Sequence, residues 1–215
     1  MLTPIRLIVG IGNPGSKYAL TRHNAGQRWV ESLAELNQIN LAASTRHQGY
    51  LGRGEIHGRD VRLLVPTTYV NNSGNSVGSV CRYFDLEPAE VLVAYDEVAF
   101  PAGVSRLKFG GGANGHNGVK SVIQHFSGSR DFGRLRIGVG HPGNASAVVG
   151  FLTRVDMPKA DRELSEISSS LDEQCLSWLL EGDWQKAMTK FHSKPSLVSD
   201  EESKERPNET KPATD

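Results

Sequence analysis

Two side chains suited to acid–base chemistry stand where predicted strands and helices meet. His23 lies just before a helix that the apolar spacing predicts from Asn24, and Asp96 directly follows a buried strand-like run at residues 91–95. An imidazole exchanges protons near neutral pH, and a carboxylate beside it fixes the ring and stabilises the imidazolium. We expect dipoles at the helix start to disfavour the imidazolium of His23. The alternative makes His23 a helix-entry residue and Asp96 a turn carboxylate.

Carboxamide side chains recur in similar loops. Asn13 lies in the segment GIGNPG, Asn71 in PTTYVNNSG and Asn117 in GGGANGHNG. A carboxamide can donate to a developing oxyanion, although helix capping also explains asparagine at such places. Five glycines within residues 110–118 allow close backbone approach to a ligand and lid-like motion; the alternative for this segment is a flexible turn.

Four basic residues alternate along two strand-like segments. Arg106 and Lys108 are two positions apart, and so are Arg134 and Arg136. Residues two apart on a strand point to one face, so the four side chains predict a basic strip for phosphates. An ordinary solvated strand face is the alternative.

The stretch LIVGIGNPG at residues 7–15 has the glycine spacing of a dinucleotide-binding loop. Such a loop needs a helix that begins within the glycines and an acidic residue about 20 positions further on, after a second strand. Here helical spacing begins only near Asn24, and Glu31 and Glu35 lie inside that helix. A nucleotide-dependent oxidoreductase is therefore the less favoured hypothesis.

Other chemistries lack their motifs. The sequence contains no His-Glu-x-x-His, and Cys81 and Cys175 are too isolated for a thiolate zinc site or a disulfide framework. A Gly-x-Ser-x-Gly spacing occurs at residues 74–78, but it lies inside the helix predicted from near 72 and not at the strand-to-helix turn that a serine nucleophile needs. We predict no metal, no cofactor and no serine nucleophile. A histidine–aspartate pair, carboxamides and a basic strip suit water attack on an activated carbonyl attached to a nucleic acid.

Strands and helices alternate along the chain, which is typical of a layered α/β fold with a mostly parallel or mixed sheet. In the helical region at 158–191 we expect five apolar side chains to face inward: Leu164, Ile167, Leu171, Leu176 and Leu179. The predicted strands are 5–9, 48–57, 59–65, 91–95, 104–109 and 135–139, and the predicted helices begin near 24, 72 and 119.

Composition indicates one globular domain. The 215 residues have a formal charge of zero, but residues 199–215 carry a net −3, which leaves +3 on the preceding part. We assign residues 1–193 to a catalytic domain and 194–215 to a disordered polar tail. The start lacks a signal-peptide pattern, and no apolar run approaches the roughly 18 residues of a membrane span. These features predict a cytoplasmic protein.

The order of these motifs resembles the bacterial peptidyl-tRNA hydrolase family over roughly residues 5–192. The resemblance implies a monomeric single domain with a mixed, mostly parallel twisted sheet between helices, in three α/β/α layers. It also implies cofactor-free cleavage of the ester that joins a peptide to the 3′-terminal ribose of tRNA, with peptidyl-tRNA as the partner and no membrane or metal. The residues that match the family's site are His23 as base with Asp96; Asn13, Asn71 and Asn117 for the peptide backbone, the ribose and the attacking water or oxyanion; Tyr18, Val70, Gly115 and His116 along the cleft; and Arg106, Lys108 and Arg136 for the phosphates.

Some positions depart from the family pattern. Val70 replaces a common methionine, Ala99 replaces an acidic residue, Asn114 replaces a glycine, and residues 144–147 lack lysines. These changes concern affinity and specificity rather than the reaction. A non-catalytic RNA-binding member, similar to splicing factors, is the main alternative, and the presence of His23 and Asp96 argues against it.

Overall fold

The computed structural model describes residues 3–194, so the predicted tail lies outside the described residues apart from Lys194. Strands and helices alternate as predicted. The strands are β1 (Leu7–Gly10), β2 (Ala42–Ser44), β3 (Gly49–Ile56), β4 (Arg59–Pro66), β5 (Val91–Glu97), β6 (Ser105–Phe109) and β7 (Gly133–Gly138). The helices are α1 (Ala25–Leu36), α2 (Ser73–Phe84), α3 (Asn117–His125), α4 (Val148–Thr153), α5 (Lys159–Ser169), α6 (Glu173–Glu181) and α7 (Trp184–His192).

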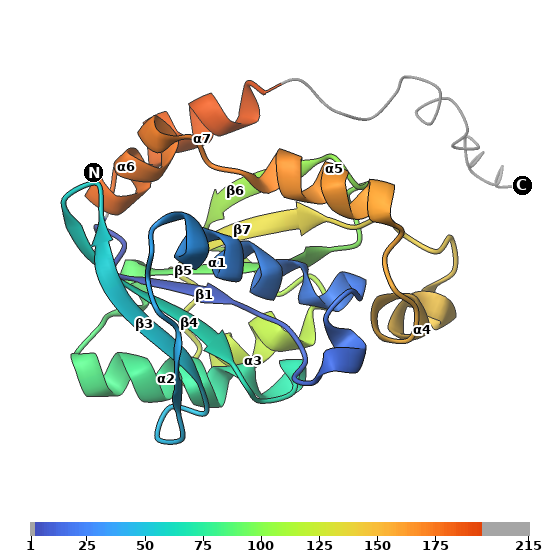
Figure 1. Cartoon of the computed structure of the whole chain (residues 1–215), viewed down its shortest axis with the longest axis horizontal. Coiled ribbons are helices and arrows are strands. Elements are labelled where there is room, and N and C mark those ends of the chain that lie inside the picture. The colour runs from blue at the N-terminus through green and yellow to red at the C-terminus, as the bar shows by residue number, and fades with distance from the viewer. Residues whose placement is uncertain (1–2, 195–215) are drawn as a thin grey trace, which may run out of the picture.

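The seven strands form one sheet in the order β2-β3-β4-β1-β5-β7-β6. The central strands β4, β1, β5 and β7 are parallel, and the outer strands β2, β3 and β6 are antiparallel to their neighbours. Helices α1, α5, α6 and α7 cover one face of the sheet, and α2 and α3 cover the other (Figure 1). The predicted three-layer, mixed and mostly parallel α/β fold is confirmed.

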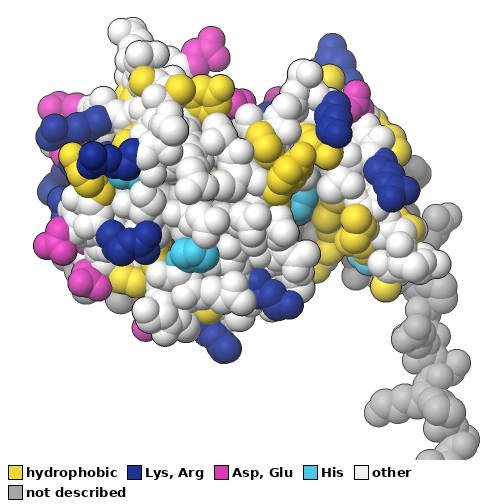
Figure 2. All heavy atoms as spheres, turned by 90° about the horizontal axis from the view of Figure 1, so that it is seen from below, with side chains coloured by type: hydrophobic (Ala, Val, Ile, Leu, Met, Phe, Trp, Pro, Cys, Tyr) yellow, Lys and Arg dark blue, Asp and Glu magenta, His cyan; other side chains and the backbone are white. Residues whose placement is uncertain are grey.

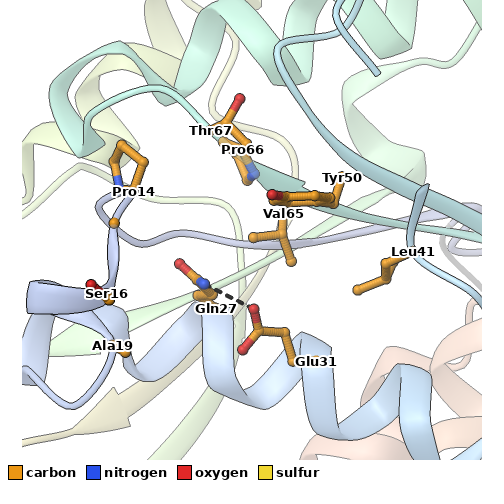
Figure 3. A pocket seen from close by; sticks show the side chains of 11 residues that line it. Pro14, Ser16, Ala19, Gln27, Glu31, Leu41, Tyr50, Val65, Pro66 and Thr67 are labelled. Atoms are coloured by element: carbon orange, nitrogen blue, oxygen red, sulfur yellow. Dashed lines mark hydrogen bonds between the residues drawn. The ribbon is translucent and has the colours of Figure 1, made fainter. Parts of the chain in front are cut away.

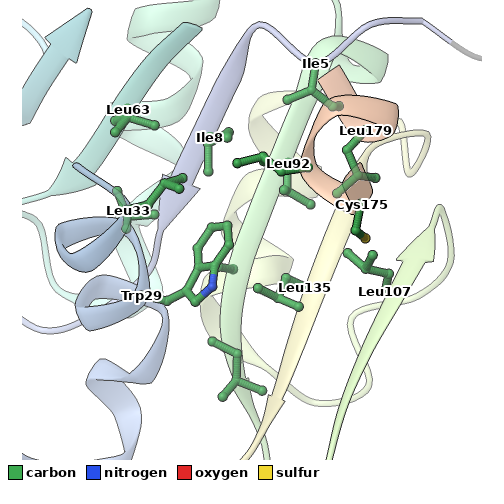
Figure 4. Packing of buried hydrophobic residues seen from close by; sticks show 14 of the residues in the cluster. Ile5, Ile8, Trp29, Leu33, Leu63, Leu92, Leu107, Leu135, Cys175 and Leu179 are labelled. Carbon is green, nitrogen blue, oxygen red and sulfur yellow. The ribbon is translucent and has the colours of Figure 1, made fainter. Parts of the chain in front are cut away.

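The core consists of one apolar cluster on each face of the sheet. On the first face, Trp29 and Leu33 of α1 lie over Ile8 and Leu92 of the sheet (Figure 4). Every residue of β1 and β5 is buried, as expected for parallel strands covered on both sides. The rigid central strands therefore end together at one edge, where β1 continues into Ile11–Asn13 and β5 ends at Asp96 and Glu97.

Gly10 and Gly12 of the opening stretch allow the following helix to pack closely, whereas a Cβ on Gly15 would meet nothing within 4 Å. A Cβ on Gly10 would lie 2.4 Å from the carbonyl oxygen of Gly26, and one on Gly12 would lie 2.7 Å from Oε1 of Gln27. A Cβ on Gly26 would in turn lie 2.1 Å from the carbonyl oxygen of Ala94. These contacts seat the start of α1 directly on β1 and β5, close to His23.

The expectation for Ile167 was wrong. Its side chain is 58% exposed, and the inward face of α5 instead presents Ser165 and Ser169. The Ser165 hydroxyl donates to the Gly138 carbonyl at 2.6 Å, and the Trp29 indole N–H donates to the Ser169 carbonyl at 3.1 Å. Because α5 packs closely through small side chains, apolar spacing alone placed the wrong face inward.

We expect Gly26→Ala to destabilise the fold by about 3 kcal/mol, because the added methyl group meets a backbone carbonyl that cannot move aside. The midpoint of urea unfolding measures this change. Gly150→Ala in α4 is the matched control: its nearest neighbour would be Arg154 Cδ at 3.9 Å, so stability should hold or rise slightly. Equal midpoints for the two variants would contradict the packing role of Gly26.

Candidate active site

His23 and Asp96 meet directly at the carboxyl edge of the sheet. His23 sits in a 3₁₀ turn, Arg22–Asn24, that leads into α1, and its Nδ1 lies 2.8 Å from Oδ1 of Asp96 at the end of β5. The Asp96 side chain is 1% exposed and that of His23 is 13% exposed. The sequence placed both residues in neighbouring loops, and the structure brings them into hydrogen-bond contact.

A second histidine shares the same carboxylate oxygen. Nε2 of His116 lies 3.0 Å from Oδ1 of Asp96, while Nδ1 of His116 accepts a hydrogen bond from the Val119 backbone N–H at the start of α3. A carboxylate only accepts, so His23 donates through Nδ1 and His116 through Nε2. Nε2 of His23 is therefore left to act on a bound molecule.

Burial and charge act in opposite directions on this pair. Burial alone would raise the pKa of Asp96, but the two imidazoles outweigh it and hold that pKa well below its usual range. Burial disfavours a charged His23, but the Asp96 charge and hydrogen bond outweigh this and raise the pKa of His23. The expectation that helix dipoles set a neutral His23 was wrong in sign, because the carboxylate is closer and carries a full charge.

His23, Asp96 and His116 also form a group of potential metal ligands. Their ligand atoms lie within 4.8 Å of one another. Oδ2 of Asp96 is buried and makes no hydrogen bond within residues 3–194. In this arrangement the imidazole N–H groups already occupy Oδ1, so hydrogen bonds account for the cluster, and the absence of a metal stays a prediction.

Asn13 is held in place by its neighbours. Its Oδ1 accepts from the Val70 backbone N–H at 3.0 Å. Its own backbone N–H and carbonyl are bound by the Asn24 side chain at 2.8 and 3.0 Å. Asn24 therefore ties two loops together instead of capping α1, which has no side-chain cap bond. The Asn13 amide group remains as a donor at a fixed position.

The glycine-rich segment is anchored at its base. The Arg134 guanidinium donates to the carbonyls of Gly111 and Gly112. Asn114 adopts a left-handed φ of 46°, a conformation that asparagine tolerates better than most residues. Asn117 is exposed as the first residue of α3, and His116, not Asn117, is the helix cap.

The remaining predicted site residues belong to the same loops, since Asn71 follows Val70, Gly115 precedes His116 and Tyr18 lies five residues after Asn13. Val70 is buried against the position where a Cβ of Gly118 would lie, which closes the floor beside Asn13. Asn71 and Gly115 are exposed, and Tyr18 is half-buried at the end of a 3₁₀ turn.

The four basic residues of β6 and β7 do lie on adjacent strands. Arg106 is opposite Arg136, and Lys108 is opposite Arg134. Arg106 and Lys108 are exposed, but Arg134 is buried. Arg136 donates from Nε and Nη2 to Oε2 of Glu97 at 3.0 and 2.8 Å. Two of the four side chains are thus open to a phosphate, one is ion-paired and one holds the glycine loop.

Sequence reasoning did not foresee the role of Arg22. Its guanidinium stacks 3.8 Å from the Phe151 ring of α4, and Nε donates to the Val139 carbonyl at 3.2 Å. Arg22 thus joins the turn of His23 to α4 and to the end of β7. Its place beside His23 was the only sequence signal, because Phe151 and Val139 are more than a hundred residues away along the chain.

Exposed apolar side chains lie close to this turn. The Met157 backbone N–H donates to the Leu20 carbonyl at 2.8 Å, and Leu20, Val149 and Val155 are 44%, 68% and 60% exposed. Figure 2 shows a hollow with a histidine in it and hydrophobic side chains along one wall.

Within residues 3–194, no helix is both long and apolar enough to cross a membrane.

Fold and site together define a three-layer α/β protein with a histidine–aspartate centre at the carboxyl edge of its sheet. The family model for peptidyl-tRNA hydrolase matches residues 7–199. The chain belongs to the peptidyl-tRNA hydrolase family, a family of ester-cleaving enzymes, as the motif order predicted.

Relatives and solved structures agree with this assignment. The chain is 45% identical over 193 residues to a peptidyl-tRNA hydrolase of Teredinibacter turnerae, covering 90% of this chain and 100% of that protein. It is 46% identical over 192 residues to one of Saccharophagus degradans, covering 89% and 97%. The crystal structure of peptidyl-tRNA hydrolase from Acinetobacter baumannii superposes with a TM-score of 0.86 at 40% identity, covering 92% of this chain and 99% of that one.

Proposed function

We propose that this enzyme hydrolyses the ester between a peptide, or an N-blocked aminoacyl group, and the 3′-terminal ribose of tRNA, and so recycles tRNA. The observation that carries the mechanism is the His23–Asp96 hydrogen bond, which leaves Nε2 of His23 as a base. Nε2 takes a proton from water as the water oxygen bonds to the ester carbonyl carbon. The tetrahedral oxyanion then collapses, the ribose oxygen leaves, and the imidazolium returns the proton to it.

Two contributions account for the rate. General-base catalysis by a positioned imidazole contributes roughly 10²–10⁴-fold. A carboxamide donor to the oxyanion contributes about another 10²–10³-fold, and we assign this role to the fixed Asn13 amide or to Asn117. Asn71 would bind the ribose or the peptide backbone, with Tyr18, Val70, Gly115 and His116 along the same groove.

A thiol nucleophile is unsupported. Cys81 and Cys175 are both buried, and burial raises the pKa of Cys81 to about 12 and that of Cys175 to about 11. Because a thiolate is needed for attack, water is the better nucleophile. An ester is already an activated acyl group, so a covalent intermediate is unnecessary.

Incubation with N-acetyl-aminoacyl-tRNA, without metal or nucleotide, tests this function. We expect release of free tRNA. Binding of tRNA without release would favour the alternative, an RNA-binding member of the same fold. We expect the enzyme to act as a cytoplasmic monomer.

For the tRNA phosphates we propose Arg106, Lys108 and Arg136. Lys108→Ala should raise KM for intact N-acetyl-aminoacyl-tRNA and reduce the slope of log affinity against log salt by about 1. The loss should be small for a short aminoacyl-nucleotide fragment, which lacks those phosphates. Arg136→Ala should act in the same direction, and it also frees Glu97.

Arg59→Ala is the control for this series, because Arg59 opens β4 at the opposite end of that strand from the site. Its KM should stay close to that of the wild type. Equal losses for intact tRNA and for the fragment would remove the phosphate role.

A further inference from the structure

A cavity lies beside the loop that carries Asn13. It has a volume of about 520 Å³ and is bounded by the loop at residues 14–19, by Gln27 and Glu31 of α1, by Tyr50 of β3 and by Thr67 after β4 (Figure 3). None of the catalytic side chains assigned above lines it. The hydrolysis proposed above therefore leaves this cavity without a role.

The lining of this cavity suits an organic cation. Glu31 is its one charged lining residue, and Oε1 of Glu31 accepts a hydrogen bond from Gln27 at 2.8 Å. Within residues 3–194 Glu31 makes no ion pair, so its other oxygen is open to a cation. The half-exposed Tyr50 ring faces the cavity together with Leu41 and Val65. A carboxylate next to an aromatic ring and aliphatic walls complements an ammonium or guanidinium group on a short apolar stem.

A continuous chain of hydrogen bonds runs from this cavity to Asn13. Gln27 Nε2 donates to Glu31, and Asn24 Nδ2 donates to Gln27 Oε1 at 3.1 Å. The same Asn24 amide group holds the Asn13 carbonyl, and Asn24 Oδ1 accepts from the Asn13 N–H. The amide groups of Asn24 and Gln27 both donate toward Glu31, and the Glu31 carboxylate is the final acceptor of this chain. Whatever steadies Glu31 and Gln27 also steadies the backbone of Asn13.

We propose that this cavity binds an alkylammonium or guanidinium group on Glu31, and that the hydrogen bonds through Gln27 and Asn24 couple its occupancy to the catalytic loop. The coupling rests on the proposed function, whereas the binding does not. The cation has two possible sources: a lysine or arginine side chain of the substrate's peptide, or a free amine in solution.

Binding is tested without any substrate. Agmatine, a guanidinium on an aliphatic amine, is titrated into the full-length protein by calorimetry. Glu31 is exposed, and an ion pair at an exposed carboxylate is screened by solvent. We therefore expect binding to the wild type and about fivefold weaker binding to Glu31→Gln, which corresponds to about 1 kcal/mol. Glu35→Gln is the matched control: it removes the same charge from the same helix at an exposed position outside the cavity. No binding at millimolar agmatine, or equal loss in both variants, would overturn the site.

Hydrolysis separates the two sources. Peptidyl-tRNAs that carry lysine or norleucine in the peptide are compared with and without agmatine. If the peptide supplies the cation, KM is lower for the lysine substrate, agmatine competes with that substrate, and the preference is lost in Glu31→Gln. If a free amine is the ligand, agmatine raises kcat about fivefold for both substrates, a modest coupling. If agmatine binds at Glu31 but produces neither of these effects, the coupling is refuted. If the wild type hydrolyses none of the substrates, the proposed function is refuted instead.

Gln27→Met tests the path of the coupling. This variant keeps a similar side-chain length but has no amide to join Glu31 to Asn24. Agmatine affinity should stay within about threefold of the wild type, while the effect of agmatine on kcat disappears. An undiminished effect on kcat would exclude the path through Gln27.

Discussion

Replacement of His23 by alanine is expected to reduce turnover of N-acetyl-aminoacyl-tRNA by about 10²–10⁴-fold, while tRNA binding is retained. The structure gives the reason: Nδ1 of His23 is committed to Asp96, and Nε2 is the free nitrogen that can take a proton from water. Single-turnover rates measure the chemical step, and filter binding of uncharged tRNA measures the binding.

His23→Asn is a second variant for the same prediction. Its carboxamide can still donate to Asp96 but offers no basic nitrogen. If loss of the base causes the slow turnover of His23→Ala, then His23→Asn should be equally slow. Near-normal turnover by either variant would rule out His23 as the base.

Asp96→Asn is expected to lower kcat by roughly 10²–10⁴-fold and to shift its pH dependence. Only neutral His23 can act as a base, so activity should rise with pH through the pKa of His23. The Asp96 charge raises that pKa above its ordinary value, so the wild-type rise should lie above pH 6.5. Without the charge the pKa falls, and the rise in the variant should move to lower pH. A pH series of single-turnover rates measures both effects.

Glu97→Gln is the matched control for the pH shift. It neutralises the next carboxylate along β5, which pairs with Arg136 and not with His23. Its acidic limb should coincide with that of the wild type. If the activity of Asp96→Asn rises at the same pH as that of the wild type, or at a higher pH, Asp96 does not raise the pKa of His23.

Much of the fold followed from local patterns. Residues 7–9 of β1 and residues 91–95 of β5 are apolar throughout, and the helix starts of α1 and α2 follow helical spacing, so the positions of these elements were predicted closely. His23 and Asp96 were expected near each other because functional loops gather at the carboxyl ends of parallel strands. Their direct contact required the structure, because no local pattern sets the angle at which a loop enters a helix.

Other features depend on distant partners and left no sequence signal. The alternation of Arg134 and Arg136 is typical of a solvated strand face. In the structure, however, Arg134 is buried beneath the glycine-rich segment, and Arg136 forms an ion pair with Glu97. The cap of α3 falls on His116 because the same ring also reaches Asp96. Asparagine is the more common cap by propensity, but tertiary contacts decided the position.

His116 links the charge of the catalytic centre to the folding of a helix end. A neutral imidazole has a single N–H, and His116 donates it to Asp96 while its other nitrogen accepts from the first turn of α3. Both ring nitrogens are therefore engaged, and the ring that holds Asp96 also holds the first turn of α3, which begins at Asn117. A movement of α3 that breaks one of these bonds would loosen the other, so the carboxylate behind the base and the carboxamide at the helix end would open together, as one local unfolding unit.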